Sequence, residues 1–184
     1  RKFVKTRNMI TRSRREGVTV REVTGIDLHN ESDLANQLDE IDAMWLRNKG
    51  RHVKAMQFLV GERGGRAQKH RRLFIAQHDG QVVAYISYSP VFGSQPGWLY
   101  DLTRRRPDAP PGAIEHLFAD AAFVFADEGA GWMHLGLTPF VGLDPEHAFP
   151  GRHSTLLGKG LDLVREHGDS LYPARSQLSF KLKW

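Results

Sequence analysis

The sequence predicts an α/β protein built on one mixed β-sheet with helices on both faces, and three observations support this prediction. Two strand-like runs, 73–78 and 81–92, flank Asp79-Gly80, which is a strong β-hairpin signal. A third apolar run, 98–103, leads through a charged loop into a helical pattern at 113–127. A hairpin followed by strand–helix crossovers gives a sheet that mixes antiparallel and parallel strands and has helices on both faces.

The N-terminal part supplies a helix, a strand and a second helix. Residues 3–16 predict a helix with a thin apolar stripe and basic remaining faces, and Gly17 is suited to end it. Residues 18–23 alternate in polarity and predict a strand. Ser32 is the expected N-cap of a helix over 33–48. The buried side of that second helix carries Leu34, Leu38, Ile41, Trp45 and Leu46.

The C-terminal part supplies two more helices and two strands. The helix at 113–127 has a continuous apolar face and is followed by a short apolar strand at 132–137. Residues 154–167 predict a weak helix, because its two glycines cost roughly 0.5–1 kcal/mol each relative to alanine. Alternation over 176–184 predicts a last strand. The apolar face of the 113–127 helix carries Ile114, Leu117, Phe118, Ala121, Ala122 and Phe125.

Composition narrows the classes of partner. The 184 residues are enough for one domain with a real core, and 40% hydrophobic and 26% charged residues are ordinary for a globular protein. A net charge of +5 favours an anionic partner such as nucleic acid, a phospholipid surface or a phosphorylated cofactor. The sequence has no cysteine, which excludes disulfides and thiol nucleophiles, and its histidines show no metal-binding spacing. No apolar run reaches the ~20 residues that span a bilayer.

The clearest candidate site lies where the 98–103 strand is expected to end. Asp101 and Arg104 are predicted at that end, and Arg105 and Arg106 follow directly. A carboxylate beside several guanidinium groups suits acyl transfer or phosphate binding. The alternative interpretation is an ordinary strand–loop–helix connection with solvated arginines.

The helix start that follows this loop also suits an anion. Pro110, Pro111 and Gly112 turn the chain into the helix, where unpaired N–H groups and a partial positive charge are exposed. The element order is similar to the GCN5-related N-acetyltransferase fold, in which a pyrophosphate-binding loop precedes such a helix. The usual loop pattern is Gln/Arg-x-x-Gly-x-Gly/Ala, whereas here Arg106 is followed by Pro-Asp-Ala-Pro-Pro-Gly-Ala. Proline lacks the N–H that binds a phosphate oxygen, so this departure argues against coenzyme A binding.

A second resemblance extends over most of the chain. Its features, in order, are Arg7-Asn8 and Arg12 before Gly17, Phe58 with Gly61, Phe74-Ile-Ala-Gln-His-Asp-Gly-Gln-Val-Val-Ala-Tyr85, Asp101-Leu-Thr-Arg104, Gly112, Leu135-Gly-Leu-Thr-Pro139, Leu171-Tyr172 and Phe180-Lys-Leu-Lys-Trp184. This ordered set resembles the C-terminal domain of the phosphatidylglycerol lysyltransferases, also called multiple peptide resistance factors or aminoacyl-phosphatidylglycerol synthases. The short motif Asp-Leu-x-Arg is unspecific by itself, and the order of the whole set carries the resemblance.

The resemblance implies a tRNA-dependent aminoacyltransferase. The expected reaction moves an aminoacyl group, expected to be lysyl, from aminoacyl-tRNA to a phosphatidylglycerol hydroxyl, without a cofactor or metal. The family's domain is a double acetyltransferase-like unit behind a multi-helix membrane domain, at the cytoplasmic face of the bacterial cell membrane. Residues 1–17 would be a basic linker helix and 18–184 the second acetyltransferase-like unit, with aminoacyl-tRNA and anionic phospholipid as partners. The sequence leaves the oligomeric state open.

Each candidate residue has a role in that reaction. Asp101 suits a general base or an anchor for the aminoacyl ammonium group, and Arg104 suits bidentate phosphate binding. Lys181 and Lys183, on one face of the predicted last strand, suit a phosphate or an oxyanion, unless they only protect a sheet edge. Two other functions stay open: an acetyl-coenzyme A N-acetyltransferase and a noncatalytic unit that binds tRNA or lipid. The resemblance also implies five further substrate-binding residues, which are Arg105, Arg106, Gly112, Thr138 and Tyr172.

Overall fold

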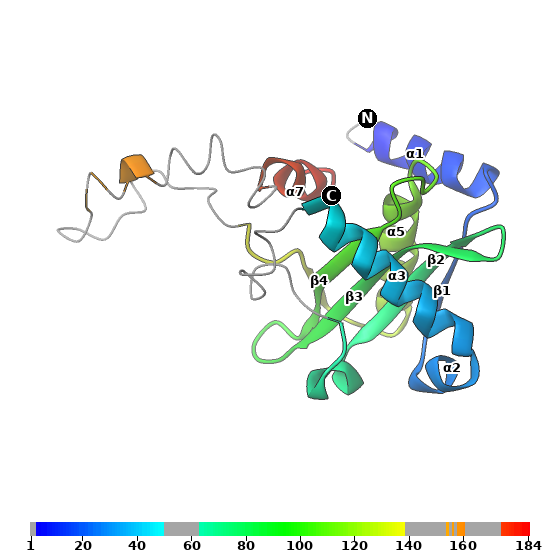
Figure 1. The fold of residues 1–184 in the computed structure, drawn as a ribbon. Helices are drawn as coiled ribbons and strands as arrows, with labels where there is room; N and C mark the ends of the chain where they lie inside the picture. The colour runs from blue at the N-terminus through cyan, green and yellow to red at the C-terminus, as the bar shows by residue number, and fades with distance from the viewer. Residues whose placement is uncertain (1–2, 50–62, 139–153, 155, 157, 161–173) are drawn as a thin grey trace. The chain divides into compact units, whose positions relative to one another are not determined.

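The computed structural model describes residues 3–49, 63–138, 154, 156, 158–160 and 174–184. The chain divides into two compact units, residues 1–136 and 137–184 (Figure 1). The first unit contains the whole described β-sheet, and the second contains helix α7 (Ala174–Lys181). The predicted segment 53–60 and most of the predicted helix 154–167 lie outside the described residues, although 156 and 158–160 are helical.

The sheet has five strands in the order β1-β2-β3-β4-β5. Neighbouring strands pair antiparallel from β1 to β4, and β5 pairs parallel with β4, so the predicted mixed α/β sheet is confirmed. The β5 pairing covers only three residues of β4, from Gly97 to Leu99. The strands are β1 (Thr19–Val23), β2 (Arg72–His78), β3 (Gln81–Val91), β4 (Gly97–Arg105) and β5 (Trp132–His134).

The β2–β3 hairpin forms because its turn residues accept positive φ angles. Asp79 has φ 49° and Gly80 has φ 78°, which is the combination a tight two-residue hairpin turn requires. A second irregularity lies between β3 and β4, where Ser87 pairs with Leu102 and Tyr88 pairs with Tyr100. Asp101 is therefore the extra residue of a β-bulge, and bulges redirect side chains.

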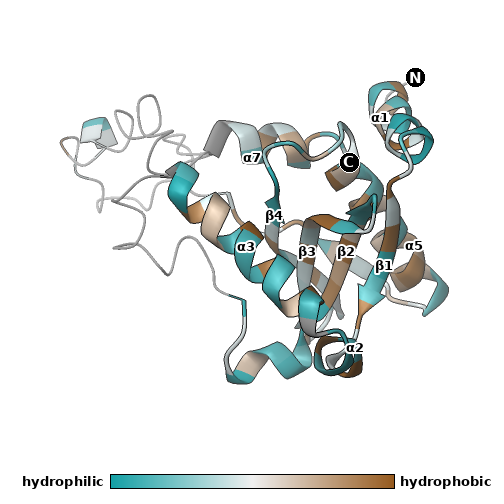
Figure 2. Ribbon diagram, turned by 45° about the vertical axis from the view of Figure 1, so that its right-hand side comes forward, coloured by the Kyte–Doolittle hydropathy of each residue, from teal (hydrophilic) through white to brown (hydrophobic). Residues whose placement is uncertain are grey.

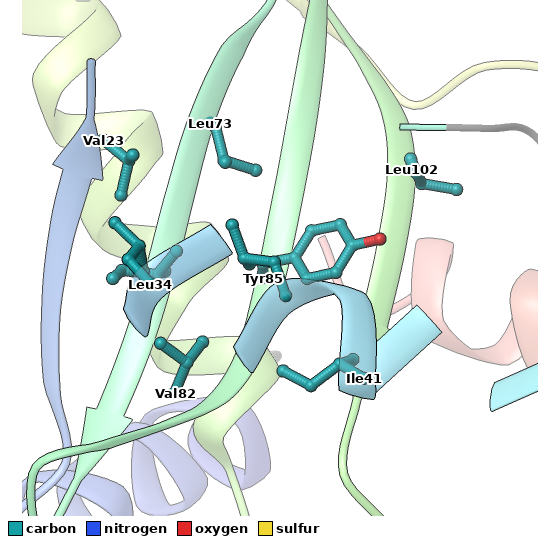
Figure 3. Packing of buried hydrophobic residues seen from close by; sticks show 9 residues of the cluster. Val23, Leu34, Ile41, Leu73, Val82, Tyr85 and Leu102 are labelled. Carbon is teal, nitrogen blue, oxygen red and sulfur yellow. The ribbon is translucent and has the colours of Figure 1, made fainter. Parts of the chain in front are cut away.

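Helix α3 (Ser32–Lys49) covers one face of the sheet (Figure 1). Its Leu34, Leu38 and Ile41 are almost fully buried and pack on side chains of β1 to β4. Burying each such side chain stabilises the fold by roughly 1.5–3 kcal/mol. Figure 3 shows this cluster from close by, with the Tyr85 ring extending from β3 toward β4. The cluster comprises Val23, Leu34, Leu38, Ile41, Leu73, Ile75, Val82, Tyr85 and Leu102.

Helix α5 (Ala113–Asp127) packs on the opposite face through aromatic contacts. The ring of Phe125 lies 5.3 Å from that of Trp98 and 4.9 Å from that of Tyr88, and Phe118 lies 5.7 Å from Tyr100. Trp98 and Tyr100 alternate with the residues that face α3, as a strand requires. The prediction of helices on both faces is thus confirmed.

Helix α1 (Val4–Arg15) packs beside α5 rather than on the sheet. Ser13 contacts His116 and Arg14 contacts Asp120, so the two helices run in the same direction. These side-chain contacts are polar, and Figure 2 shows hydrophilic residues on α1 and on α3.

Three expectations about elements were wrong or incomplete. A short helix, α2 (Gly25–Asn30), was not predicted, although Thr24 and Asp27 form the capping box that begins it. Strand β4 continues to Arg105, two residues beyond the predicted end. The predicted last strand is helix α7 followed by a turn.

Candidate functional site

Asp101 lies in the middle of β4, so the prediction that it stands at a strand end was wrong. Its Oδ2 accepts a hydrogen bond from Ser89 Oγ at 2.6 Å and lies 3.2 Å from Arg71 Nε. Arg71 Nε also donates to Ser89 Oγ at 3.2 Å. We call Asp101, Ser89 and Arg71 the Asp101 cluster. The Asp101 side chain is 30% exposed, so a ligand can reach this carboxylate.

Arg104 is buried, unlike the solvated arginine of an ordinary loop. Its side chain is 4% exposed, and its Nε lies 3.0 Å from Asp42 Oδ1 of α3. The guanidinium carbon lies 3.9 Å from the ring centroid of Trp45, which is close enough for a cation–π contact. Helix α3 thus supplies both a carboxylate and an aromatic face to this arginine.

Asp42 has further partners. The Tyr85 hydroxyl donates to Asp42 Oδ1, and Arg63 Nε donates to Asp42 Oδ2 at 3.2 Å. Burial, with the nearby Asp42 charge, raises the pKa of Tyr85, so the phenol remains a protonated donor. We call Asp42, Tyr85, Arg63 and Arg104 the Asp42 network. It joins α3, β3, β4 and the segment before the 3-10 helix η2 (Arg66–His70).

The Asp101 cluster and the Asp42 network lie on the same face of the sheet. Tyr85 pairs with Arg104 on the α3 face, and residues two apart along a strand share a face. Ser87 and Ser89 therefore follow Tyr85 on that face. Ser87 is 1% exposed, and its hydroxyl has no hydrogen-bond partner among the described residues. The α3 face thus carries a line of polar groups from Asp101 to Arg104, with Ser87 between them.

The other predicted arginines point to different places. Arg106 donates to Glu40 of α3 at 2.6 Å and to the Val82 carbonyl at 3.1 Å, whereas Arg105 is exposed on β4. The three arginines therefore do not form one phosphate-binding loop, because Arg104 and Arg106 pair with carboxylates of α3 while Arg105 is exposed.

Gly112 has a packing role. It is the N-cap of α5 with φ 85°, and a Cβ at this position would lie 2.1 Å from the Met9 carbonyl oxygen of α1. Two of the nearby N–H groups are bonded within the turn, Ala113 to Pro110 O and His116 to Gly112 O. The start of α5 does not fit a coenzyme A pyrophosphate, because α1 lies against it and Pro110 and Pro111 lack N–H donors.

The second unit contains the other four predicted residues. Thr138 is half-buried, and Lys181 Nζ donates to the Leu137 carbonyl at 2.9 Å. Burial lowers the pKa of Lys181. Lys183 Nζ lies 5.5 Å from the Phe180 ring centroid. The two lysines do not share a strand face, because this segment is helical, and Tyr172 lies outside the described residues.

Neither a metal site nor a membrane span is found in the described part of the chain. No group of three or more histidine, aspartate or glutamate residues there could hold a metal ion. Among the helices described, none is long and apolar enough to cross a membrane.

The family follows from comparison with known proteins. The family model described as "Phosphatidylglycerol lysyltransferase, C-terminal" matches residues 1–184. The chain belongs to this family. The predicted resemblance is thereby confirmed. No curated protein sequence matches the chain.

Two solved structures are similar to this family member. One is the C-terminal domain of a putative lysylphosphatidylglycerol synthetase from Agrobacterium fabrum, with a TM-score of 0.54, 21% identity, and coverage of 75% of this chain and 41% of that chain. The other is L-PGS from Bacillus licheniformis, with a TM-score of 0.56, 18% identity, and coverage of 86% and 46%. These likenesses show a shared fold, and the chain spans less than half of either structure.

Sequence reasoning missed the partners of Asp101 and Arg104 in this lysyltransferase-family domain. Asp42 follows Leu38 by four residues and precedes Trp45 by three, so it lies beside the apolar stripe of α3. A carboxylate at such a position was the available signal. Ser89 and Arg71 gave no comparable signal, because their proximity depends on strand pairing.

Proposed function

We propose that this chain is part of an enzyme that transfers an aminoacyl group, lysyl in the first instance, from aminoacyl-tRNA to a phosphatidylglycerol hydroxyl. The observation that carries the proposal is the family match over all 184 residues. The proposed setting is the cytoplasmic face of the bacterial cell membrane, with a membrane domain elsewhere in the full-length protein and with anionic phospholipid and aminoacyl-tRNA as partners.

The donor ester determines what the protein must supply. The lipid hydroxyl oxygen attacks the aminoacyl carbonyl carbon and forms the new ester, while the bond to the tRNA ribose oxygen breaks. The hydroxyl proton leaves during attack and the ribose oxygen takes up a proton, so no ATP or metal is needed for the balance. Catalysis requires a base or positioning group, together with stabilisation of the tetrahedral oxyanion.

Asp101 is the proposed central residue of the site. Its carboxylate is partly exposed, and Ser89 and Arg71 hold its Oδ2. A carboxylate held in this way suits a general base that receives the hydroxyl proton, or an anchor for the aminoacyl ammonium group. Arg104 is the proposed cation for a phosphate or for the oxyanion. Arg105, Arg106, Thr138, Tyr172, Lys181 and Lys183 remain proposed substrate-binding residues.

The test uses the full-length protein, a panel of labelled aminoacyl-tRNAs and extracted lipids, with chromatography of the lipid products. Asp101→Asn keeps size and hydrogen-bonding capacity but removes the charge. A lost general base should slow transfer by ~10²–10⁴-fold, whereas a lost ammonium anchor should raise the KM for the donor. Normal transfer by Asp101→Asn at subsaturating donor would show that the site is assigned wrongly. Binding of tRNA or lipid without any transfer by the wild type would favour a noncatalytic unit.

A further inference from the structure

Asp42 contacts three side chains from different segments of the first unit, and one of them is Arg104. One carboxylate accepts hydrogen bonds from Tyr85 Oη of β3 and from Arg63 Nε at 3.2 Å, and it forms an ion pair with Arg104 of β4, whose Nε lies 3.0 Å from Oδ1. The Asp42 side chain is 22% exposed and that of Arg104 is 4% exposed, so the Arg104 end of this pair is largely shielded from water. Charge-assisted contacts of this kind are stronger than contacts at the surface.

The contacts restrict the direction of the Arg104 guanidinium. Asp42 Oδ1 lies 3.0 Å from its Nε as an ion pair, and the centroid of the Trp45 ring lies 3.9 Å from its central carbon. A guanidinium is planar, so a carboxylate beside its Nε edge and a ring over one face together limit where its terminal nitrogens can point. Asp42 and Trp45 are three residues apart on α3, so their side chains are neighbours on the helix and both contact Arg104.

Two arginines share the one carboxylate of Asp42. Arg104 and Arg63 bring two positive charges to the one carboxylate of Asp42, and the second carboxylate that binds Arg63, Asp39, is 74% exposed. Solvent weakens an exposed ion pair, so Asp39 holds Arg63 less firmly than Asp42 does. The polar line toward Asp101 passes Ser87, whose buried hydroxyl has no partner in the described part of the chain.

We propose that Asp42 is a positioning residue that orients Arg104 toward a phosphate or the oxyanion of the aminoacyl-transfer reaction. This inference rests on the proposed function. Asp42 acts through Arg104 and does not itself contact the substrate. The shared ligand chemistry is an anionic oxygen, and three sources provide one: the lipid phosphate, a phosphate of the tRNA acceptor end, and the tetrahedral intermediate.

The test is a double-mutant cycle in the full-length enzyme. Asp42→Asn, Arg104→Gln and the double variant are compared by kcat/KM in the labelled-lipid assay. Asp42→Asn should lower kcat/KM by about tenfold to a hundredfold, the range expected when a group loses its charged partner. In the Arg104→Gln background the same substitution should cost less than about threefold, because the group it orients is gone. Asp33→Asn, on the same helix and hydrogen-bonded to Gln37, is the matched control and should retain wild-type kcat/KM.

The kinetic constants identify the source of the anionic oxygen. A raised KM for lipid assigns the lipid phosphate, a raised KM for aminoacyl-tRNA assigns the tRNA phosphate, and a lowered kcat alone assigns the oxyanion. If Asp42→Asn proves unstable in urea denaturation, Tyr85→Phe replaces it, since it removes one donor to the same carboxylate. Tyr85→Phe should lower kcat/KM by about threefold or more with wild-type Arg104 and not with Arg104→Gln.

Two results would overturn the inference. One is wild-type kcat/KM in a stably folded Asp42→Asn enzyme, or in Tyr85→Phe where that variant replaces it. The other is an equal loss with and without Arg104, which would mean that Asp42 acts on the fold in general. Absence of transfer by the wild-type enzyme is a different result, because it would refute the proposed function and the positioning role with it.

Discussion

Replacement of Gly112 by alanine would test how α1 and α5 are packed. An alanine at φ 85° is strained by roughly 1–2 kcal/mol. Its Cβ would also lie 2.1 Å from the oxygen and 2.7 Å from the carbon of the Met9 carbonyl, both of which are backbone atoms. Because α1 is a helix, it must shift as a unit to relieve this contact.

Such a shift would break the polar contacts that join the two helices. Ser13 Oγ lies 3.2 Å from His116 Nδ1, Arg14 Nε donates to His116 Nε2 at 3.1 Å, and Arg14 Nη2 donates to Asp120 at 2.7 Å. Each is worth about 0.5–1.5 kcal/mol, and the exposed Arg14–Asp120 contact lies at the low end. With the backbone strain, the free energy of unfolding should fall by about 3 kcal/mol, which for a chain of this size lowers Tm by roughly 6–12 °C.

Gly129→Ala is the matched control for this measurement. Gly129 has φ 80° at the other end of α5, but nothing lies within 4 Å of its added Cβ. In urea denaturation, the free energy of unfolding of Gly129→Ala should fall only by the backbone strain. That of Gly112→Ala should fall further, by about 1–2 kcal/mol. Equal stabilities of the two variants, within about 0.5 kcal/mol, would refute the close approach of α1.

Three further outcomes are expected. Calorimetry with acetyl-coenzyme A should show no stoichiometric micromolar binding, because the α5 start lacks suitable N–H donors; such binding would instead support an N-acetyltransferase. Lys5, Arg7 and Arg15 are exposed on α1, so replacing all three with glutamine should reduce the log–log salt slope of tRNA binding by about 2, and an unchanged slope would make them a solvated surface. Burial lowers the pKa of His116, so its contribution to stability is present above about pH 6.5 and is lost as pH falls, by at most about 1.4 kcal/mol per pH unit. Thermal unfolding of His116→Gln between pH 5 and 7 should show a correspondingly weaker pH dependence, and an identical profile would contradict this.

The sequence was sufficient for elements whose signals are local. Asp79-Gly80 predicted the hairpin because the residues that adopt a tight turn are few. The apolar stripes of α3 and α5 predicted both helices, because a period near 3.6 over fifteen or so residues is hard to produce otherwise. The length of β4 could not be predicted in the same way. Arg104 and Arg105 suggested a solvated loop, but in the structure a carboxylate and an indole of α3 lie against the buried Arg104 side chain.

The C-terminal segment shows how a short alternating pattern misleads. Lys181 and Lys183 alternate with apolar residues, which predicted a strand, but the alternation extends only from 178 to 184. Phe180 and Trp184 are four residues apart, and their rings lie 6.2 Å from each other, which is the spacing of neighbours on a helical face. Alternation over so few positions does not distinguish the two periods, and the packing of the aromatic pair favours the helical conformation.

The positions of the β4 residues change how their chemistry is understood. From the sequence, Asp101, Arg104 and the arginines after it formed one charged loop whose members act on a ligand directly. In the structure, the bulge at Asp101 places its carboxylate with Ser89 and Arg71, while Arg104 is bound by Asp42 on a helix some sixty residues earlier in the chain. Arginine can be buried in this way because its guanidinium offers donors along one edge and a flat face for stacking, which lysine does not. Whatever Arg104 contributes to the proposed aminoacyl transfer therefore depends on α3 as well as on the motif that contains it.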